Sequence, residues 1–120
     1  MAVTNTFETL HAMFKVIFCK SIWDGDTPES STTFALLRRE ETLPFAPGPG
    51  MEISWQGVPQ AIVAVRWEPA ESRFVCNMKD DCRHYIDVDT YDFEWLLRFA
   101  IDNGWSVVTK EKLSSHKRHE

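Results

Sequence analysis

The sequence predicts a small α+β domain in which a curled antiparallel sheet of about five strands packs against one main C-terminal helix. Apolar residues alternate with polar ones through much of residues 51–78, and they recur at helical spacing through residues 93–101. A chain of 120 residues can bury roughly two thirds of its unfolded surface, which suffices for one core. We therefore expect a single domain over residues 1–120, with frayed ends at 1–6 and 114–120.

The first part of the chain predicts two strands and two irregular segments. Residues 11–23 alternate between apolar and polar side chains, and residues 32–37 are apolar and β-branched, so each segment is predicted to be a strand. The intervening residues 24–31 carry the glycine, proline and short polar side chains typical of loops. Residues 43–50 contain three prolines, which remove backbone donors, so this segment is predicted to be irregular. Its leucine and phenylalanine are expected to pack on the core.

The clearest alternation predicts a three-stranded antiparallel meander with one apolar face. Apolar side chains occupy every second position of residues 51–55, 63–67 and 74–78. Short turns separate the three runs. Such a meander either belongs to an open sheet or closes into a small SH3-like barrel, and the pattern does not distinguish these forms.

The last third of the chain predicts the helix and a short final strand. Asp89 or Thr90 is a suitable N-cap, and two acids follow where the helix dipole favours negative charge. Asn103 and Gly104 form a typical helix stop, and residues 105–108 are predicted to be a strand. The residues predicted to face the sheet share helical spacing: Phe93, Leu96, Leu97, Ala100 and Ile101.

Cysteine usage and hydropathy predict the compartment. The three cysteines, Cys19, Cys76 and Cys82, match no disulfide framework, so we expect reduced thiols. The chain shows no signal-peptide pattern and no apolar run of about 18 residues, so we expect a cytoplasmic protein without a membrane partner. Cys76, Cys82 and His84 match no usual zinc motif, and alternation directs Cys76 into the core. We therefore expect no metal and no other cofactor.

The charge of the chain is unevenly distributed. The formal net charge is −5, and residues 80–94 hold six acids against one arginine. The tail from residue 110 to 120 instead holds four bases against two acids. Because an acidic surface repels phosphate, we do not expect the body of the domain to bind nucleic acid broadly.

The acidic run suggests a function because it also contains tyrosines and an arginine, and because Trp95 directly follows it. Acids mixed with tyrosine, tryptophan and arginine are typical of protein interaction sites, although many charged runs are only solvated surface. We expect a non-enzymatic domain that binds a basic protein partner, as inhibitors and immunity proteins that neutralise nucleases do. The candidate partner-binding residues are Asp80, Asp81, His84, Tyr85, Asp87, Asp89, Tyr91, Asp92 and Trp95.

The sequence leaves two other functions open, a catalyst and an adaptor or self-associating domain. No motif of a serine hydrolase, zinc protease, P-loop or Rossmann domain is present, but catalytic groups can converge in space. His84 with Asp87 and Asp89 would then serve a small enzyme or a metal-dependent catalyst. The third alternative is an SH3-like adaptor that binds a peptide between exposed aromatics, or a homodimer paired through an edge strand.

Overall fold

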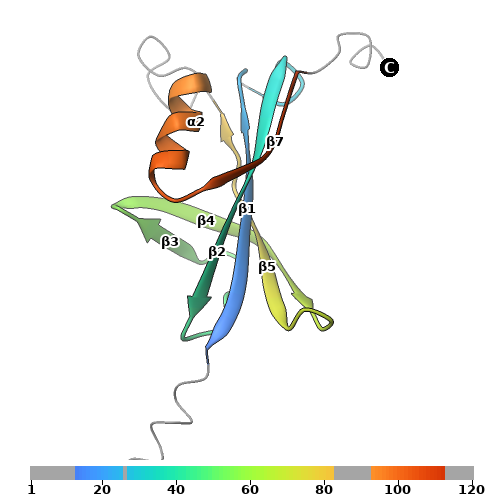
Figure 1. Cartoon of the computed structure of the whole chain (residues 1–120), viewed down its shortest axis with the longest axis vertical. Coiled ribbons are helices and arrows are strands. Elements are labelled where there is room, and N and C mark those ends of the chain that lie inside the picture. Colours follow the sequence, from blue (N-terminus) through green and yellow to red (C-terminus); the bar gives the residue numbers. More distant parts are fainter. Residues whose placement is uncertain (1–12, 26, 83–92, 113–120) are drawn as a thin grey trace, which may run out of the picture.

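The computed structural model describes residues 13–25, 27–82 and 93–112 (Figure 1). The elements are β1 (Phe14–Trp23), β2 (Thr33–Leu43), β3 (Glu52–Trp55), β4 (Val58–Glu68), β5 (Arg73–Met78), β6 (Asp81–Cys82), α2 (Phe93–Asp102) and β7 (Ser106–Lys112). Six strands follow the order β3-β4-β5-β1-β2-β7, and the short β6 pairs with β1 beside this path. Helix α2 contacts β1 and β7, so the expected α+β class is confirmed. No helix in these ranges is long and apolar enough to cross a membrane.

The sheet is mixed, and the expectation of a wholly antiparallel sheet is therefore wrong. β1 pairs antiparallel with β2 but parallel with β5 and β6. The predicted meander of β3, β4 and β5 is present and antiparallel. The path ends at β3 and β7, so the described strands form an open sheet and not a closed barrel. Alternation could not reveal this, because parallel and antiparallel strands have the same side-chain period.

β2 is longer than predicted because its charged end remains paired. The strand continues through the four charged residues 38–41 to Leu43, and Glu41 and Arg39 lie opposite Val16 and Phe18 of β1. The final strand β7 is also longer than predicted, since it pairs with β2 as far as Lys112. Backbone hydrogen bonds to a neighbouring strand thus override the stop that the side chains suggest.

A β-bulge changes which side chains of β4 face the core. The register with β5 shifts between Ile62 and Ala64, so Ile62 is buried whereas Val63 is 60% exposed. The prediction that Val63 lies in the core is wrong, because a bulge adds one residue and changes the phase of the alternation. Trp67 keeps the predicted side, opposite Phe74, but it is 47% exposed near the end of the strand, so its place in the core is also wrong. Phe45 is likewise exposed, although its neighbour Leu43 packs against the core.

The core lies between one face of the sheet and α2. The predicted inward stripe is confirmed for four of its five members, and only Ile101, which is 47% exposed, is wrong. Ile101 occupies the margin of the stripe in the last helical turn. The prediction that Cys76 points inward is confirmed, since its side chain is fully buried. The main core side chains are Val16, Phe18, Ile22, Leu37, Ile62, Cys76, Met78, Phe93, Leu96, Leu97, Ala100 and Trp105.

Helix α2 ends at Asn103 and Gly104, as predicted, in a Schellman motif. The backbone N–H of Trp105 donates to the Ala100 carbonyl at 3.0 Å, and that of Gly104 donates to the Ile101 carbonyl at 3.1 Å. Gly104 adopts a φ of +102°, a conformation that disfavours side chains. The expected N-cap residues of the helix, Asp89 and Thr90, and both expected frayed ends lie outside the described residues.

Gly104→Ala is expected to lower the free energy of unfolding by about 1–2 kcal/mol, because an L-residue at positive φ is strained. The new Cβ would also lie 3.0 Å from Arg39 Nη1. Gly48→Ala is the control, since its Cβ would meet nothing within 4 Å, and its effect should stay within about 0.5 kcal/mol. Urea denaturation measures both values. Equal stability of the two variants would contradict the Schellman geometry.

Candidate functional site

The described residues include only part of the predicted partner-binding set. Asp80, Asp81 and Trp95 have defined positions, and they do not share one surface role. The carboxylates of Asp80 and Asp81 contact β1, whereas Trp95 lies exposed on α2. The other members lie outside the described residues: His84, Tyr85, Asp87, Asp89, Tyr91 and Asp92.

Asp80 binds β1 through both of its carboxylate oxygens. Its Oδ1 accepts a hydrogen bond from the backbone N–H of Ser21 at 3.1 Å, and its Oδ2 accepts one from Trp23 Nε1 at 2.9 Å. These contacts fix the chain between β5 and β6 against β1. The Asp80 carboxylate is therefore engaged within the fold.

Asp81 neutralises a buried lysine. Lys20 Nζ donates to Asp81 Oδ2 at 2.8 Å and to Gln60 Oε1 at 3.3 Å, and it lies 4.7 Å from the centroid of the Trp105 ring. The side chain of Lys20 is only 3% exposed, and buried lysines nearly always need such a partner. One sequence signal could have found Lys20: it shares the inward positions of β1 with Phe18 and Ile22.

A second cation, Arg39, lies beside both Trp55 and Trp105. Arg39 packs 4.6 Å from the centroid of Trp55, and the Trp55 and Trp105 rings meet edge to face at 5.5 Å. Glu41 accepts a hydrogen bond from Trp55 Nε1 at 2.7 Å and one from Arg39 Nε. Arg39 also donates to the carbonyl of Asn103 at the end of α2. This cluster fastens β2, β3 and the helix end together, so it supports the fold beneath α2.

Trp95 and Phe99 form an exposed aromatic pair on α2. Positions i and i+4 share a helix face, and the two rings stack in parallel with centroids 5.0 Å apart and an interplanar angle of 9°. The two residues are 38% and 37% exposed, although the helix buries four other apolar side chains. Phe99 also borders a small recess that Val58 and Gln60 of β4 line. The pair thus offers a rigid apolar surface.

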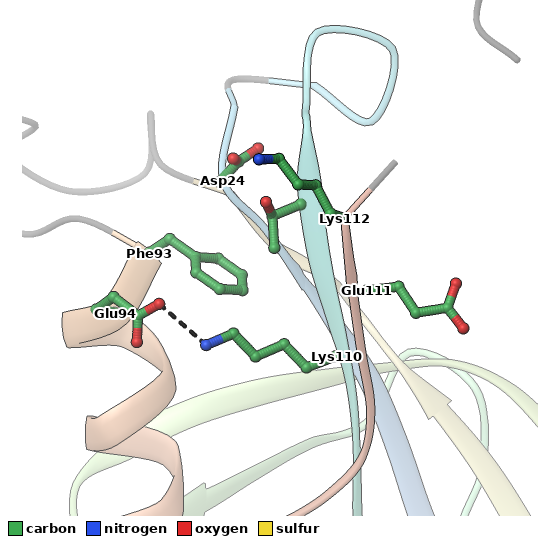
Figure 2. Close-up of a pocket in the computed structure, with 7 residues that line it drawn as sticks. Asp24, Phe93, Glu94, Lys110, Glu111 and Lys112 are labelled. Atoms are coloured by element: carbon green, nitrogen blue, oxygen red, sulfur yellow. Dashed lines mark hydrogen bonds and ion pairs between the residues drawn. The ribbon is translucent and has the colours of Figure 1, made fainter. Parts of the chain in front are cut away.

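An open cleft lies on the other flank of α2, toward β7 (Figure 2). Its volume is about 520 Å³. Lys110 Nζ pairs with Glu94 Oε2 at 3.1 Å across the cleft, and the Phe93 ring points toward β7. Figure 2 also shows the Lys112 amine opposite the Asp24 carboxylate. The lining residues are Asp24, Thr33, Phe93, Glu94, Lys110, Glu111 and Lys112.

The described residues of the cleft are mostly charged, so they suit a polar molecule. Burial raises the pKa of Asp24, but hydrogen bonds from the Thr32 hydroxyl and amide outweigh it, so the pKa lies below its usual value. Asp24 is therefore ionised at neutral pH and cannot act there as a general base that exchanges protons near pH 7. Among the residues that the structure describes, those that line the cleft include no histidine or cysteine.

The two described thiols are not activated. Burial raises the pKa of Cys76 to about 11, and burial also raises the pKa of Cys19 although Arg38 opposes it. Neither residue is a thiolate at neutral pH, so neither is a ready nucleophile. Within the described ranges, no three His, Cys, Asp or Glu side chains gather to hold a metal ion. The Cys82 side chain and His84 lie outside those ranges.

Comparison with known proteins gives no relative for this chain. No protein-family model, curated protein or solved structure matches it. A functional assignment therefore depends on the exposed and charged residues of this chain alone.

Proposed function

We propose that this protein is a non-enzymatic binding domain whose partner docks on helix α2, with Trp95 and Phe99 at the centre of the interface. The exposure of this stacked pair carries the proposal. Large aromatic rings are enriched at the centres of protein interfaces because they bury much apolar surface and lose few rotamers. The helix buries a different set of apolar side chains, Phe93, Leu96, Leu97 and Ala100, while the pair stays more than a third exposed.

The proposed partner is a basic protein. The chain carries a net charge of −5, and Asp87, Asp89 and Asp92 directly precede the helix that bears the aromatic pair. Acids that surround an apolar centre steer a basic partner toward it and speed association. Asp80 and Asp81 are assigned to the fold instead, because β1 binds both carboxylates.

Replacing both rings, as Trp95→Ala/Phe99→Ala, is expected to weaken capture of the partner at least ten-fold, because hot-spot aromatics dominate interface energies. Wild-type and variant proteins are immobilised, exposed to a lysate of the source organism and compared by quantitative mass spectrometry. The expected ligand is a basic protein that added salt releases, since the Debye length shrinks from ≈ 8 Å at physiological salt to about 3 Å at 1 M.

Trp67→Ala is the matched control. Trp67 is 47% exposed near the end of β4, where its ring contacts Phe74 of β5, and its replacement should leave capture unchanged. Circular dichroism confirms that each variant is folded. Capture that survives the double substitution, or that falls equally in the Trp67 variant, would refute a docking site on α2.

No observation on the described residues favours the alternatives. The groups of the proposed catalyst, His84, Asp87 and Asp89, lie outside them. An SH3-like adaptor needs a closed barrel, whereas the described sheet path is open. Both edge strands are poorly suited to pairing with a second copy, because β3 has only four residues and β7 carries a bulge and two lysines.

A further inference from the structure

The sheet has a second surface, on the side opposite α2, which we call the outer face. Val16 and Phe18 of β1 belong to the core with the helix, so the alternate residues Lys15, Ile17 and Cys19 point to the other side. Paired residues of neighbouring strands share a side, and the pairing places Glu40 and Val75 beside Ile17. Among the described residues, the one helix lies on the core side (Figure 1).

Strand pairing gathers cations on the outer face. The part of this face formed by β4, β5, β1 and β2 carries four cations and two carboxylates, a charge of +2, which Glu111 of β7 lowers to +1 for the five strands; the whole chain carries −5. The local sign is therefore opposite to that of the whole protein. These residues are Lys15, Arg38, Arg66, Arg73, Glu40 and Glu68.

One carboxylate orients two of the arginines. Glu68 accepts hydrogen bonds from Arg73 Nε at 2.8 Å and from Arg66 Nη2 at 3.0 Å. The hydrogen bonds of Arg73, and then those of Arg66, hold the pKa of Glu68 below its usual value, so it stays ionised. A guanidinium has five donors, so Arg66 and Arg73 have further N–H groups besides those that bond Glu68. Arg38 lies opposite Cys19 in the neighbouring strand. Burial raises the pKa of the Cys19 thiol, and the positive charges of Arg38, Arg66 and Arg73 each oppose that rise.

An aromatic pair occupies the other end of the same face. Trp23 of β1 lies opposite Phe34 of β2, and their rings stack with centroids 5.2 Å apart. Both side chains are half-buried. Trp23 follows Cys19 by four residues, which corresponds to about 13 Å along the strand. Two carboxylates adjoin this end: Glu111 of β7 lies opposite Phe34, and Asp80 Oδ2 accepts a hydrogen bond from Trp23 Nε1. The positive charge of the face therefore lies at the arginine end.

We propose that the outer face binds single-stranded nucleic acid, with Arg38, Arg66 and Arg73 on the phosphates and the Trp23–Phe34 pair against a base. Open sheet faces bind unpaired strands in this way, because phosphates need fixed cations and exposed bases stack on aromatic rings. A duplex hides its bases from such a face. The net charge predicts no broad nucleic-acid binding by the domain, but the strand pairing concentrates positive charge locally. This activity is separate from protein binding on α2.

Fluorescence anisotropy with labelled oligothymidine and oligouridine tests the proposal at several salt concentrations. Arg38→Gln/Arg66→Gln is expected to weaken binding at least ten-fold and to reduce the slope of log K against log salt by about 0.7 per arginine. Phe34→Leu keeps an apolar side chain but removes the ring, so it should weaken binding about ten-fold. Thermal melting confirms that each variant is folded.

Lys110→Gln/Lys112→Gln is the matched control, because it removes the same charge from the cleft beside α2. Its binding should change less than about three-fold, and Trp95→Ala/Phe99→Ala should bind oligonucleotide like the wild type. The proposal is overturned if the protein at about 100 μM binds no oligonucleotide at low salt, or if the arginine and lysine variants lose oligonucleotide affinity equally. It is also overturned if duplex binds as tightly as single strands. A last contradicting result is polyglutamate binding as tight as oligonucleotide binding, together with no effect of Phe34→Leu on affinity.

Discussion

Asp81→Ala is expected to lower the free energy of unfolding by about 3 kcal/mol, because it leaves the Lys20 ammonium buried without its carboxylate. The side chain of Lys20 is 3% exposed, and its Nζ lies 2.8 Å from Asp81 Oδ2. Asp81 itself is partly exposed, so the expected loss lies at the lower end of the range for buried pairs. Urea denaturation measures it.

A double-mutant cycle separates the ion pair from other effects of the substitution. Lys20→Met removes the buried charge and keeps a long apolar side chain against Trp105, so it should cost less than about 1.5 kcal/mol. Lys20→Met/Asp81→Ala should then be more stable than Asp81→Ala alone. Strictly additive losses would show that Lys20 and Asp81 do not interact.

A loss of stability in Asp81→Ala would also guide experiments on the acidic run, residues 80–94. Asp80 and Asp81 were natural choices for testing partner binding by charge removal, but both support the fold. A loss of binding after their substitution would therefore not distinguish a damaged interface from a damaged protein. Asp87, Asp89 and Asp92 are better targets, each with a stability measurement.

Leu97→Ala is expected to lower the free energy of unfolding by about 2–5 kcal/mol, since it removes buried methyl groups and leaves a cavity. Leu97 is buried in the core cluster, where α2 meets the sheet. Ile101→Ala on the same helix is the control, because Ile101 is largely exposed and its loss should stay below about 1 kcal/mol. The urea midpoints of the two variants are compared, provided that the free energy of unfolding depends on urea concentration with the same slope in both.

Equal midpoints for these two variants would place Leu97 on the surface and overturn the packing of α2. The comparison matters for function, because the orientation of the helix decides which residues it exposes. With Leu97 inward, Trp95 and Phe99 lie on an outer flank. A rotated helix would bury that flank and remove the proposed docking site.

The local features of the fold could be predicted from the sequence. Helical spacing identified Leu96, Leu97 and Ala100 as inward residues, because successive turns place them on one face. Asn103 and Gly104 identified the helix end, since few residues other than glycine tolerate positive φ. The antiparallel meander followed from short turns between alternating runs. Each of these features depends on residues close together in the chain.

The candidate site was only partly predictable. Trp95 was named from the composition of the acidic run, but its stacking partner Phe99 was not, because composition does not specify exposure. Asp80 and Asp81 were named for their charge, yet their donors lie on β1, 57 to 61 residues away in the chain. No sequence window of ordinary length contains both partners, so their engagement is visible only after folding.

The sequence by itself determined most of the secondary-structure elements, four of the five inward residues of α2 and the inward position of Cys76, because side-chain periodicity is a local property. Only the tertiary structure decided that β1 and β5 run parallel, that Ile62 replaces Val63 in the core, and that arginines gather on the outer face. These features depend on strand order and register, which are set by the packing of segments far apart in the chain. A shift of one residue moves every side chain to the opposite face of a strand, so the surfaces available for binding are fixed by register and not by composition.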